Sequence, residues 1–332
     1  MPNYTPPFTI SHKSLTLVAE ISQAVGQLSV EFEQQKLLRL RKVNRMRTVQ
    51  GSLAIEGNTL SAQQITAILD GKRIIAPPKE VQEAHNAIAA YEALLDWEPT
   101  NEDDLLAAHL IVMQSLISET GVYRNKGVGV MSGDKVIHMA PQAVRVPKLM
   151  TELLEWLATT DIHALIGSCV FHYEFEFIHP FADGNGRMGR LWQTLILSKW
   201  HPVFINIPVE SLVHQHQKEY YLAIGESNKS SDASPFIEFM LQMISNAITE
   251  SMAATDKYDG LSGGLSDGLK LSDLDKNLLI LISADPFITN VAMAAQLAKS
   301  VRTIERRIKR LRELNILQRI GAKKTGYWQV VD

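Results

Sequence analysis

The sequence has little cysteine, no long apolar run and almost no excess charge. Its single cysteine, Cys169, lies in an apolar run and has no second cysteine to pair with, which indicates a buried, unreactive thiol. A chain without disulfides suits a reducing compartment, so a cytoplasmic location is expected. Charged residues interrupt every apolar stretch before the roughly 18 residues that a membrane span needs. Residues 1–7 lack the features of a secretory signal, and no membrane partner is expected.

The net charge of −3 excludes a chain-wide attraction to nucleic acid or anionic lipid. Apolar residues make up 45% and charged residues 21% of the 332 positions, as in ordinary globular proteins. This length allows about two domains, each with its own core.

Residues 1–14 are proline-rich and predict an extended segment. From Leu15 to residue 117 the chain has the period of amphipathic helices and few strand signals, and the last of these helices is predicted at 101–117. Ser61 and Asn101 are suited to cap the helices that follow them. The charged run 31–47 is basic and is either a solvated helix face or a partner site.

The first strand signals occupy residues 127–131 and 135–138, which predict a short β-hairpin. A hairpin in a helical protein has few neighbouring strands. Its free edge either accepts an extended peptide by strand addition or belongs to an inert loop.

A polar turn joins two apolar helices that the sequence predicts at 166–178 and 191–200. Residues 179–190 read His-Pro-Phe-Ala-Asp-Gly-Asn-Gly-Arg-Met-Gly-Arg. The small residues of this turn allow backbone N–H groups to converge at a helix start, which is an anion-binding arrangement; they are Gly184, Asn185 and Gly186. Arg187 and Arg190 are three positions apart, so both can reach the same anion.

Two further residues of the turn have side chains suited to chemistry. The carboxylate of Asp183 is an oxygen ligand of the kind that Mg²⁺ takes together with phosphate oxygens. His179 is suited to act as a general base near neutral pH.

A helix is predicted to end at Gly57 and Asn58, because both residues tolerate the left-handed conformation. Glu56 in its last turn opposes the helix dipole, at a cost of a few tenths up to about 1 kcal/mol. Its placement becomes informative if a cation elsewhere in the chain pairs with it.

The end of the chain has its own composition. Residues 256–270 are rich in glycine and serine and predict a flexible linker. Residues 271–332 contain eleven Lys or Arg against six Asp or Glu, a charge of about +5. Three predicted helices followed by two short strands resemble a winged helix-turn-helix, which binds either duplex DNA or protein. The candidate DNA-contacting residues are Arg302, Arg306, Arg307, Arg310, Lys323 and Lys324.

The motif His-x-Phe-x-Asp-Gly-Asn-Gly-Arg-x-x-Arg at 179–190 resembles that of Fic-domain proteins at every fixed position. The resemblance covers roughly residues 50–245. It implies a mainly α fold, a Fic-type helical bundle with a short β-hairpin flap, followed by a small winged-helix domain. The implied division is an N-terminal helical region (1–100) with an inhibitory helix at about 45–57, a Fic core (101–255), the linker and the winged helix-turn-helix.

The resemblance implies protein adenylylation with ATP and Mg²⁺. His179 would take the proton from a Ser, Thr or Tyr hydroxyl of a target protein, and Asp183 would hold the metal. Gly184, Asn185, Gly186 and Arg187 would stabilise the phosphates, and Arg190 the γ-phosphate. A related toxin with replaced glycines is a kinase-type enzyme, so the retained glycines favour nucleotidyl transfer.

The resemblance also gives roles to earlier stretches. The inhibitory motif is similar to Ser52-x-x-x-Glu56-Gly57, in which Glu56 would pair with Arg190 and displace the γ-phosphate. The hairpin 127–138 is similar to a flap that clamps the target protein. Its residues facing nucleotide and target would be Lys135, Val136, Ile137 and His138. Asn228 resembles a residue near the adenine.

Two alternatives stand beside an autoinhibited adenylyltransferase. One is a DNA-binding transcriptional regulator whose Fic domain senses nucleotide. The other is a de-adenylylase in which Glu56 positions water. The sequence does not name the target protein and leaves the oligomeric state open, a homodimer included.

Overall fold

The structure, a computed structural model, describes residues 4–32, 38–132, 135–263, 272–297, 299–314, 316–320 and 326–330. The chain forms two compact units, Met1–Glu250 and Ser251–Asp332. Among the described residues, no helix has both the length and the apolar character to cross a membrane.

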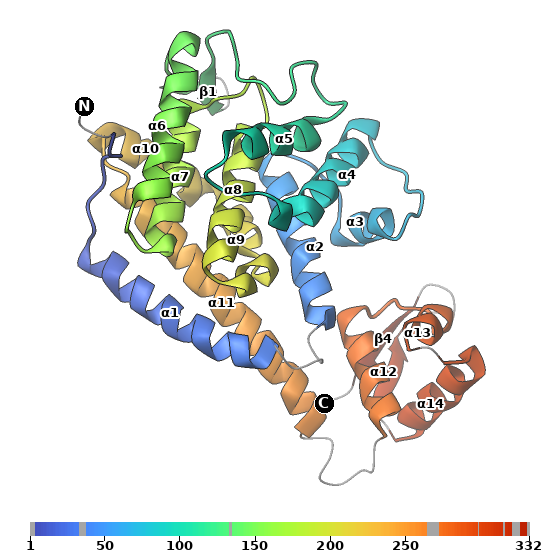
Figure 1. Cartoon of the computed structure of the whole chain (residues 1–332). Coiled ribbons are helices and arrows are strands. Elements are labelled where there is room, and N and C mark those ends of the chain that lie inside the picture. The colour runs from blue at the N-terminus through green and yellow to red at the C-terminus, as the bar shows by residue number, and fades with distance from the viewer. Residues whose placement is uncertain are drawn as a thin grey trace. The chain divides into compact units, whose positions relative to one another are not determined.

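In its described residues the first unit is helical apart from one hairpin (Figure 1). Its helices, the last of which continues past Glu250, are α1 (His12–Phe32), α2 (Leu38–Ile55), α3 (Ala62–Leu69), α4 (Pro78–Ala93), α5 (Glu102–Met113), α6 (Val146–Thr159), α7 (Ala164–Ile178), α8 (Asn185–Trp200), α9 (Val209–Gln215), α10 (Gln217–Ser230) and α11 (Ser234–Gly263). Short 3₁₀ turns lie at Leu94–Asp96, Ala143–Arg145 and Pro202–Asn206.

The core of this unit surrounds α7 and α8, which pack against each other. Almost every residue of both helices is buried, including polar residues such as Arg187 and Arg190 on α8. Cys169 on α7 is fully buried, and burial raises the pKa of its thiol to about 12. The prediction of an unreactive thiol therefore agrees with its surroundings.

Helix α2 lies close against α9, and Gly51 makes the close approach possible. A Cβ at this position would lie 2.5 Å from the backbone nitrogen of Ser211. Helix α2 ends at Ile55, and Gly57 follows with a φ of +86°. The predicted helix stop is therefore present, and Glu56 lies just past the last helical residue.

Both predicted N-caps are confirmed. Ser61 accepts a hydrogen bond from the Gln64 backbone N–H in a complete capping box. Asn101 accepts hydrogen bonds from the first turn of α5. The helix that follows Asn101 was predicted to continue to residue 117, and this is wrong. Helix α5 ends at Met113 because Gln114, with a ψ of 127°, already leaves the helical conformation, and Ser115 follows with a φ of +61°.

The predicted hairpin is formed by β1 (Gly129–Ser132) and β2 (Lys135–Met139), which pair antiparallel. Its register shifts between Val130 and Met131, as in a β-bulge. The backbone of the candidate flap residues 135–138 belongs to β2. Their side chains, and the turn residues 133–134, lie outside the described part of the chain.

The second unit contains α12 (Asp273–Ala284), α13 (Asn290–Gln296), α14 (Val301–Glu313), β3 (Leu317–Ile320) and β4 (Tyr327–Val330). The two strands pair antiparallel beside the three helices, in agreement with the predicted winged helix-turn-helix. Apolar residues from all three helices and both strands form its core.

The expected linker is partly helical, because α11 continues through Gly263. The prediction of a flexible segment from residue 256 is therefore wrong up to that point. The segment has no proline, and extending an existing helix is far less costly than starting one. The remaining linker residues, 264–270, lie outside the described part of the chain.

Candidate active site

The candidate site is the turn that joins α7 to α8. His179 is the C-cap of α7 and has a left-handed backbone, with a φ of +50°. Gly184, with a φ of +84°, precedes α8, whose first residue is Asn185. The glycine cannot be replaced without crowding, since a Cβ there would lie 2.5 Å from the sulfur of Met113.

The side chain of Asn185 holds the turn together. Its Oδ1 accepts a hydrogen bond from the Phe181 backbone N–H at 2.9 Å, and its Nδ2 donates to the Phe181 carbonyl at 2.9 Å. Asn185 is buried. Its amide group is thus used to shape the turn, and the backbone N–H groups at the start of α8 are the donors suited to an anion.

His109 on α5 contacts the turn 179–190 and supports it. The sequence did not identify this residue. Its Nδ1 accepts a hydrogen bond from Gly121 N at 2.9 Å, so the proton resides on Nε2, which donates to the Asp183 carbonyl at 3.0 Å. Its ring is stacked on Phe181, with centroids 3.7 Å apart. Burial lowers the pKa of His109 to about 4, so the ring is neutral near pH 7.

Arg124 connects the turn to the hairpin and was likewise missed. Its guanidinium donates to the carbonyl of His179 at 2.7 Å and to that of Ile178 at 3.2 Å. It also donates to the carbonyls of Lys126 and Pro141 on either side of the hairpin, at 2.9 and 2.6 Å. One buried side chain thereby fixes the base of the hairpin relative to the candidate catalytic histidine.

Glu56 and Arg190 are brought together, as the resemblance implied. Glu56 Oε1 accepts a hydrogen bond from Arg190 Nη2 at 2.7 Å. The same nitrogen donates to the Ser52 carbonyl at 3.1 Å, and Nε donates to Ser52 Oγ at 3.3 Å. Burial alone would lower the pKa of Arg190, but the charge of Glu56 raises it, so the buried guanidinium stays cationic.

Gly186 lies directly beneath Glu56. A Cβ at Gly186 would overlap Glu56 Oε1, so the Glu56 carboxylate lies against the bare backbone of the turn. The Glu56 carboxylate therefore occupies space at the start of α8, where the backbone N–H groups and Arg190 favour a negative charge.

Arg187 has two acidic neighbours. Its Nη2 lies 3.5 Å from Asp183 Oδ1, and its Nη1 lies 3.7 Å from Oε1 of Glu83 on α4. Asp183 also accepts a hydrogen bond from Gly184 N at 2.6 Å, and 52% of its side chain is exposed. Glu83 was not identified from the sequence.

Glu176 on α7 lies near the candidate base. Its Oε2 is 3.8 Å from His179 Nδ1, and its Oε1 is 3.9 Å from His172 Nε2. The pKa of Glu176 is raised to about 7, chiefly by burial. The charge of Arg190 acts to lower this pKa, and the charge of Glu56 acts to raise it. Its Oε1 is buried and has no hydrogen-bond partner among the described residues.

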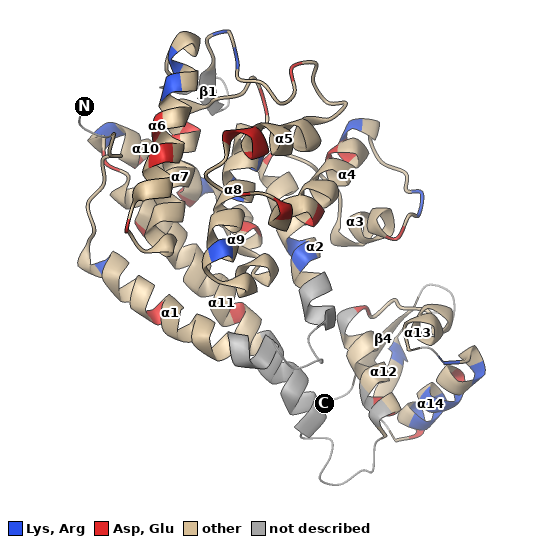
Figure 2. Ribbon diagram, viewed as in Figure 1, with Lys and Arg blue, Asp and Glu red and all other residues tan. Residues whose placement is uncertain are grey.

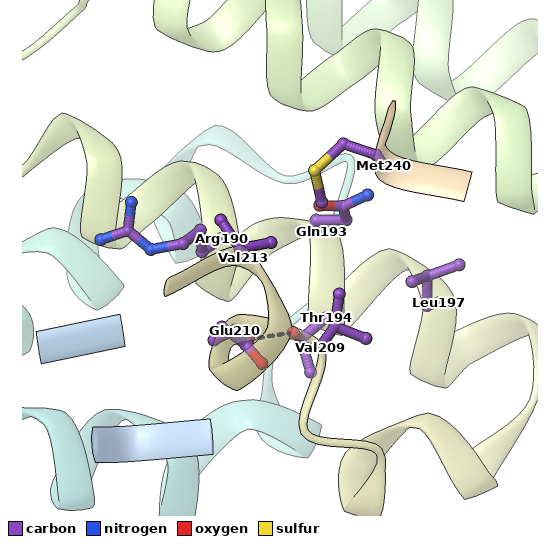
Figure 3. Close-up of a pocket in the computed structure, with 8 residues that line it drawn as sticks. All are labelled: Arg190, Gln193, Thr194, Leu197, Val209, Glu210, Val213 and Met240. Carbon is purple, nitrogen blue, oxygen red and sulfur yellow. Dashed lines mark hydrogen bonds between the residues drawn. The ribbon is translucent and has the colours of Figure 1, made fainter. Parts of the chain in front are cut away.

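A cavity that Arg190 helps to line is too small for a nucleotide. This cavity of about 10 Å³, enough for about one water, lies beside Glu210 on α9 (Figure 3). Glu210 Oε1 accepts a hydrogen bond from Thr194 Oγ1 at 2.8 Å and from Tyr91 OH at 2.9 Å.

Asn228 on α10 accepts a hydrogen bond from Tyr173 OH on α7 at 2.8 Å. This contact fixes its amide beside α7. Its proposed proximity to an adenine stays a prediction.

The candidate DNA-contacting residues of α14 do not form one uniform set. Figure 2 shows Lys and Arg positions in blue along the ribbon of this helix, and Arg302, Arg306 and Arg310 are exposed on it. Arg307 instead lies 3.3 Å from Oδ2 of Asp275, a fully buried residue of the α12 capping box. Lys323 and Lys324 lie outside the described residues.

Comparisons with known proteins agree with this fold and site. A model of the Fic/DOC family matches residues 99–197, and one described as winged helix-turn-helix DNA-binding matches residues 271–318. A solved Fic family protein from Desulfovibrio desulfuricans G20 is 42% identical, covers 99% of this chain and 98% of its own, and has a TM-score of 0.76. The chain belongs to the Fic/DOC family.

Two relatives have names that describe an activity. Protein adenylyltransferase Fic from Nematostella vectensis is 30% identical over 62% of this chain and 48% of its own length. Protein adenylyltransferase fic-1 from Caenorhabditis elegans is 30% identical over 66% of this chain and 42% of its own. The chain spans less than half the length of these relatives. A solved portion of C. elegans Fic-1 is 25% identical, with a TM-score of 0.58 over 73% of this chain and 74% of its own.

Proposed function

We propose that this protein is an adenylyltransferase that transfers AMP from ATP to a Ser, Thr or Tyr hydroxyl of a target protein. The contact between Glu56 and Arg190 carries the proposal, because it puts an anion where a phosphate group would otherwise bind. The names of the relatives and the complete turn motif support the same activity.

In the proposed reaction His179 accepts the proton of the target hydroxyl. The hydroxyl oxygen attacks the α-phosphorus of ATP, the bond from that phosphorus to the bridging oxygen breaks, and pyrophosphate leaves. Arg187, Arg190 and the backbone N–H groups at the start of α8 stabilise the negative charge on the phosphates. Catalysis then comes chiefly from positioning and from charge stabilisation.

Asp183 suits the Mg²⁺ that would accompany ATP. No group of three or more possible metal ligands occurs among the described residues, so a metal here would take most of its ligands from phosphates and water. The half-exposed carboxylate of Asp183 fits that pattern. Bound Mg²⁺ would neutralise phosphate charge.

The hairpin 127–138 is the proposed docking site for the target segment, whose backbone would pair with a free strand edge. Arg124 supports this assignment because it fixes the base of the hairpin beside His179. The absence of any disulfide favours the cytoplasm as the place of reaction. A homodimer is compatible with this scheme.

The proposal is tested with ATP labelled in its α- or its γ-phosphate. The Glu56→Gly variant, incubated with a cell lysate, is expected to transfer the α-label to protein and to leave the γ-label in pyrophosphate. His179→Ala in the same background controls for the base. Transfer of the γ-label would indicate a kinase instead, and undiminished transfer by His179→Ala would remove the assigned base.

A second candidate function is DNA binding by the winged-helix unit. The exposed basic residues of α14 and the match to a DNA-binding helix-turn-helix favour it. The full chain should bind duplex DNA with an affinity that falls as salt rises. No binding at low salt would leave protein contacts as the role of this unit.

Removal of AMP from a modified target is a further possibility for the same site, with Glu56 positioning the water. Loss of label from a pre-modified target, in wild type but not in Glu56→Gly, would favour it over transfer.

A further inference from the structure

A second carboxylate lies against the other arginine of the turn. Glu83 on α4 is nearly buried, with 11% of its side chain exposed, and its Oε1 lies 3.7 Å from Arg187 Nη1. Its Oε2 accepts a hydrogen bond from Asn58 Nδ2 at 2.9 Å. Glu83 thus contacts both the anion-binding turn and the chain that directly follows the inhibitory Glu56.

Arg187 is held less firmly than Arg190. Its ion-pair distances of 3.7 Å to Glu83 and 3.5 Å to Asp183 are longer than those of good charge-assisted hydrogen bonds. Its Nε is buried and has no hydrogen-bond partner among the described residues. This guanidinium therefore has donors left for an anion, while the nearby carboxylate of Glu83 repels that anion.

We infer that Glu83 is a second inhibitory carboxylate. It neutralises Arg187 as Glu56 neutralises Arg190, and it thereby lowers the affinity of the turn for the phosphates of ATP. The inference rests on the proposed function of the site. It assigns regulation to α4 as well as to α2. Both arginines of the turn are then occupied by carboxylates from helices that precede the motif.

Asn58 links the two carboxylates. It lies two residues after Glu56, and its side chain donates to Glu83 Oε2 and to the Glu80 carbonyl, the latter at 3.2 Å. Because Asn58 follows Glu56 so closely, a movement of Glu56 away from Arg190 is expected to move Asn58 as well. The hydrogen bond between Asn58 and Glu83 would then weaken, which couples Glu83 to the position of Glu56.

Glu80, one turn earlier on α4, provides a matched control. Its Oε2 accepts hydrogen bonds from Thr59 N at 2.7 Å and from Thr59 Oγ1 at 2.8 Å. Like Glu83, it binds the segment that directly follows Glu56, but its partners are Thr59 groups rather than an arginine. Glu80→Gln thus weakens the attachment of that segment to α4 without changing the charge beside Arg187.

The test measures the Kd values of Mg·ATP and of adenosine for the full-length wild type, Glu83→Gln, Glu80→Gln and Glu56→Gly by titration calorimetry. Glu83→Gln should bind ATP about fivefold more tightly than wild type, the lower end of usual coupling between sites. Its affinity for adenosine, which has no phosphate, should not change. Glu80→Gln should leave the ratio of the two Kd values at the wild-type value. Glu83→Met is measured alongside, with a thermal unfolding curve for each variant.

Unchanged or weaker ATP binding by Glu83→Gln and Glu83→Met would overturn the inference. An equal gain in affinity for adenosine would overturn it too, and so would an equal gain in ATP affinity in Glu80→Gln. Either result would show a general loosening of the segment that follows Glu56. Failure of the proposed function has a different signature: Glu56→Gly would bind ATP without transferring AMP, or no variant would bind ATP at all.

Discussion

Glu56 Oε1 lies 2.7 Å from Arg190 Nη2, although the two residues are 134 positions apart in the chain. The contact joins the end of α2 to the first turns of α8. Two features hold it in place: the close packing of α2 on α9, and the hydrogen bonds between Ser52 and Arg190. Weakening either feature should loosen the contact between Glu56 and Arg190 without touching the candidate catalytic residue.

Gly51→Ala tests the packing of α2. A methyl group here would overlap the backbone at Ser211, so the substitution should lower the free energy of unfolding by about 1–3 kcal/mol. It should also raise AMP transfer, because α2 carries Glu56. Gly26→Ala is the control, since nothing lies within 4 Å of a Cβ there. Chemical denaturation and labelling with α-labelled ATP check both effects; equal stability of the two variants would contradict the account.

His109→Phe tests the support beneath the turn. The variant keeps a ring to stack on Phe181 but leaves the Asp183 carbonyl and the Gly121 N–H without their partner. A loss of about 1–3 kcal/mol per unsatisfied buried group is expected. In the Glu56→Gly background kcat should fall more than the ATP affinity does. A variant with unchanged kcat would show that His109 does not position the turn.

His109 should also make the stability of the folded protein fall at acid pH. The pKa of His109 in the folded state, about 4, lies below its ordinary value of about 6.5. The unfolded chain therefore binds a proton more readily between these values. Stability from this group is complete above about pH 6.5 and is lost as pH falls to about 4, by up to about 3 kcal/mol. The difference in unfolding free energy between wild type and His109→Phe should shrink over this range, and a pH-independent difference would contradict it.

Glu176→Gln should have the opposite pH dependence. The pKa of Glu176 is raised from 4.5 to about 7 by burial, so the folded state loses stability as pH rises between these values, where the unfolded chain ionises first. The variant should therefore gain stability relative to wild type at pH 8 compared with pH 5, by up to about 3 kcal/mol. Urea unfolding at both values measures this. Equal effects at the two pH values would mean that Glu176 does not titrate between them.

Arg306 and Arg307 are neighbours on α14 with different expected roles. Arg306→Ala should weaken binding to duplex DNA and reduce the salt slope by about 1, as for the loss of one phosphate contact. Arg307→Ala should lower the stability of the winged-helix unit by about 1–3 kcal/mol, because buried Asp275 loses its cationic neighbour. Gel shifts over a range of salt and unfolding curves separate the two. Identical behaviour of both variants would contradict the distinction.

Local patterns predicted the parts of this protein that depend on adjacent residues. The helix stop at Gly57, the caps at Ser61 and Asn101, and the winged-helix elements follow from turn chemistry and periodicity. The residues 179–190 identified the candidate site because its backbone geometry is encoded in one short segment.

The supporting residues could not be predicted in this way. His109, Arg124 and Glu83 act through contacts with chain segments that are distant in the sequence, so their own neighbourhoods carry no signal. The role of Asn185 was also hidden: its side chain shapes the turn, which only the folded backbone reveals. The residues around Arg307 in the sequence do not distinguish it from the other arginines of α14, whereas its contact with Asp275 does.

The most direct measurement compares initial rates of AMP transfer by wild type, Glu56→Gln and Glu56→Gly at saturating Mg·ATP. Glu56→Gln keeps the size of the side chain and removes its charge, so it isolates the ion pair with Arg190. If Glu56 and the γ-phosphate compete for Arg190, both variants should exceed wild type by about tenfold or more, the scale of a lost coupling of about 1.4 kcal/mol. Rates equal to or below that of wild type in both variants would contradict the account.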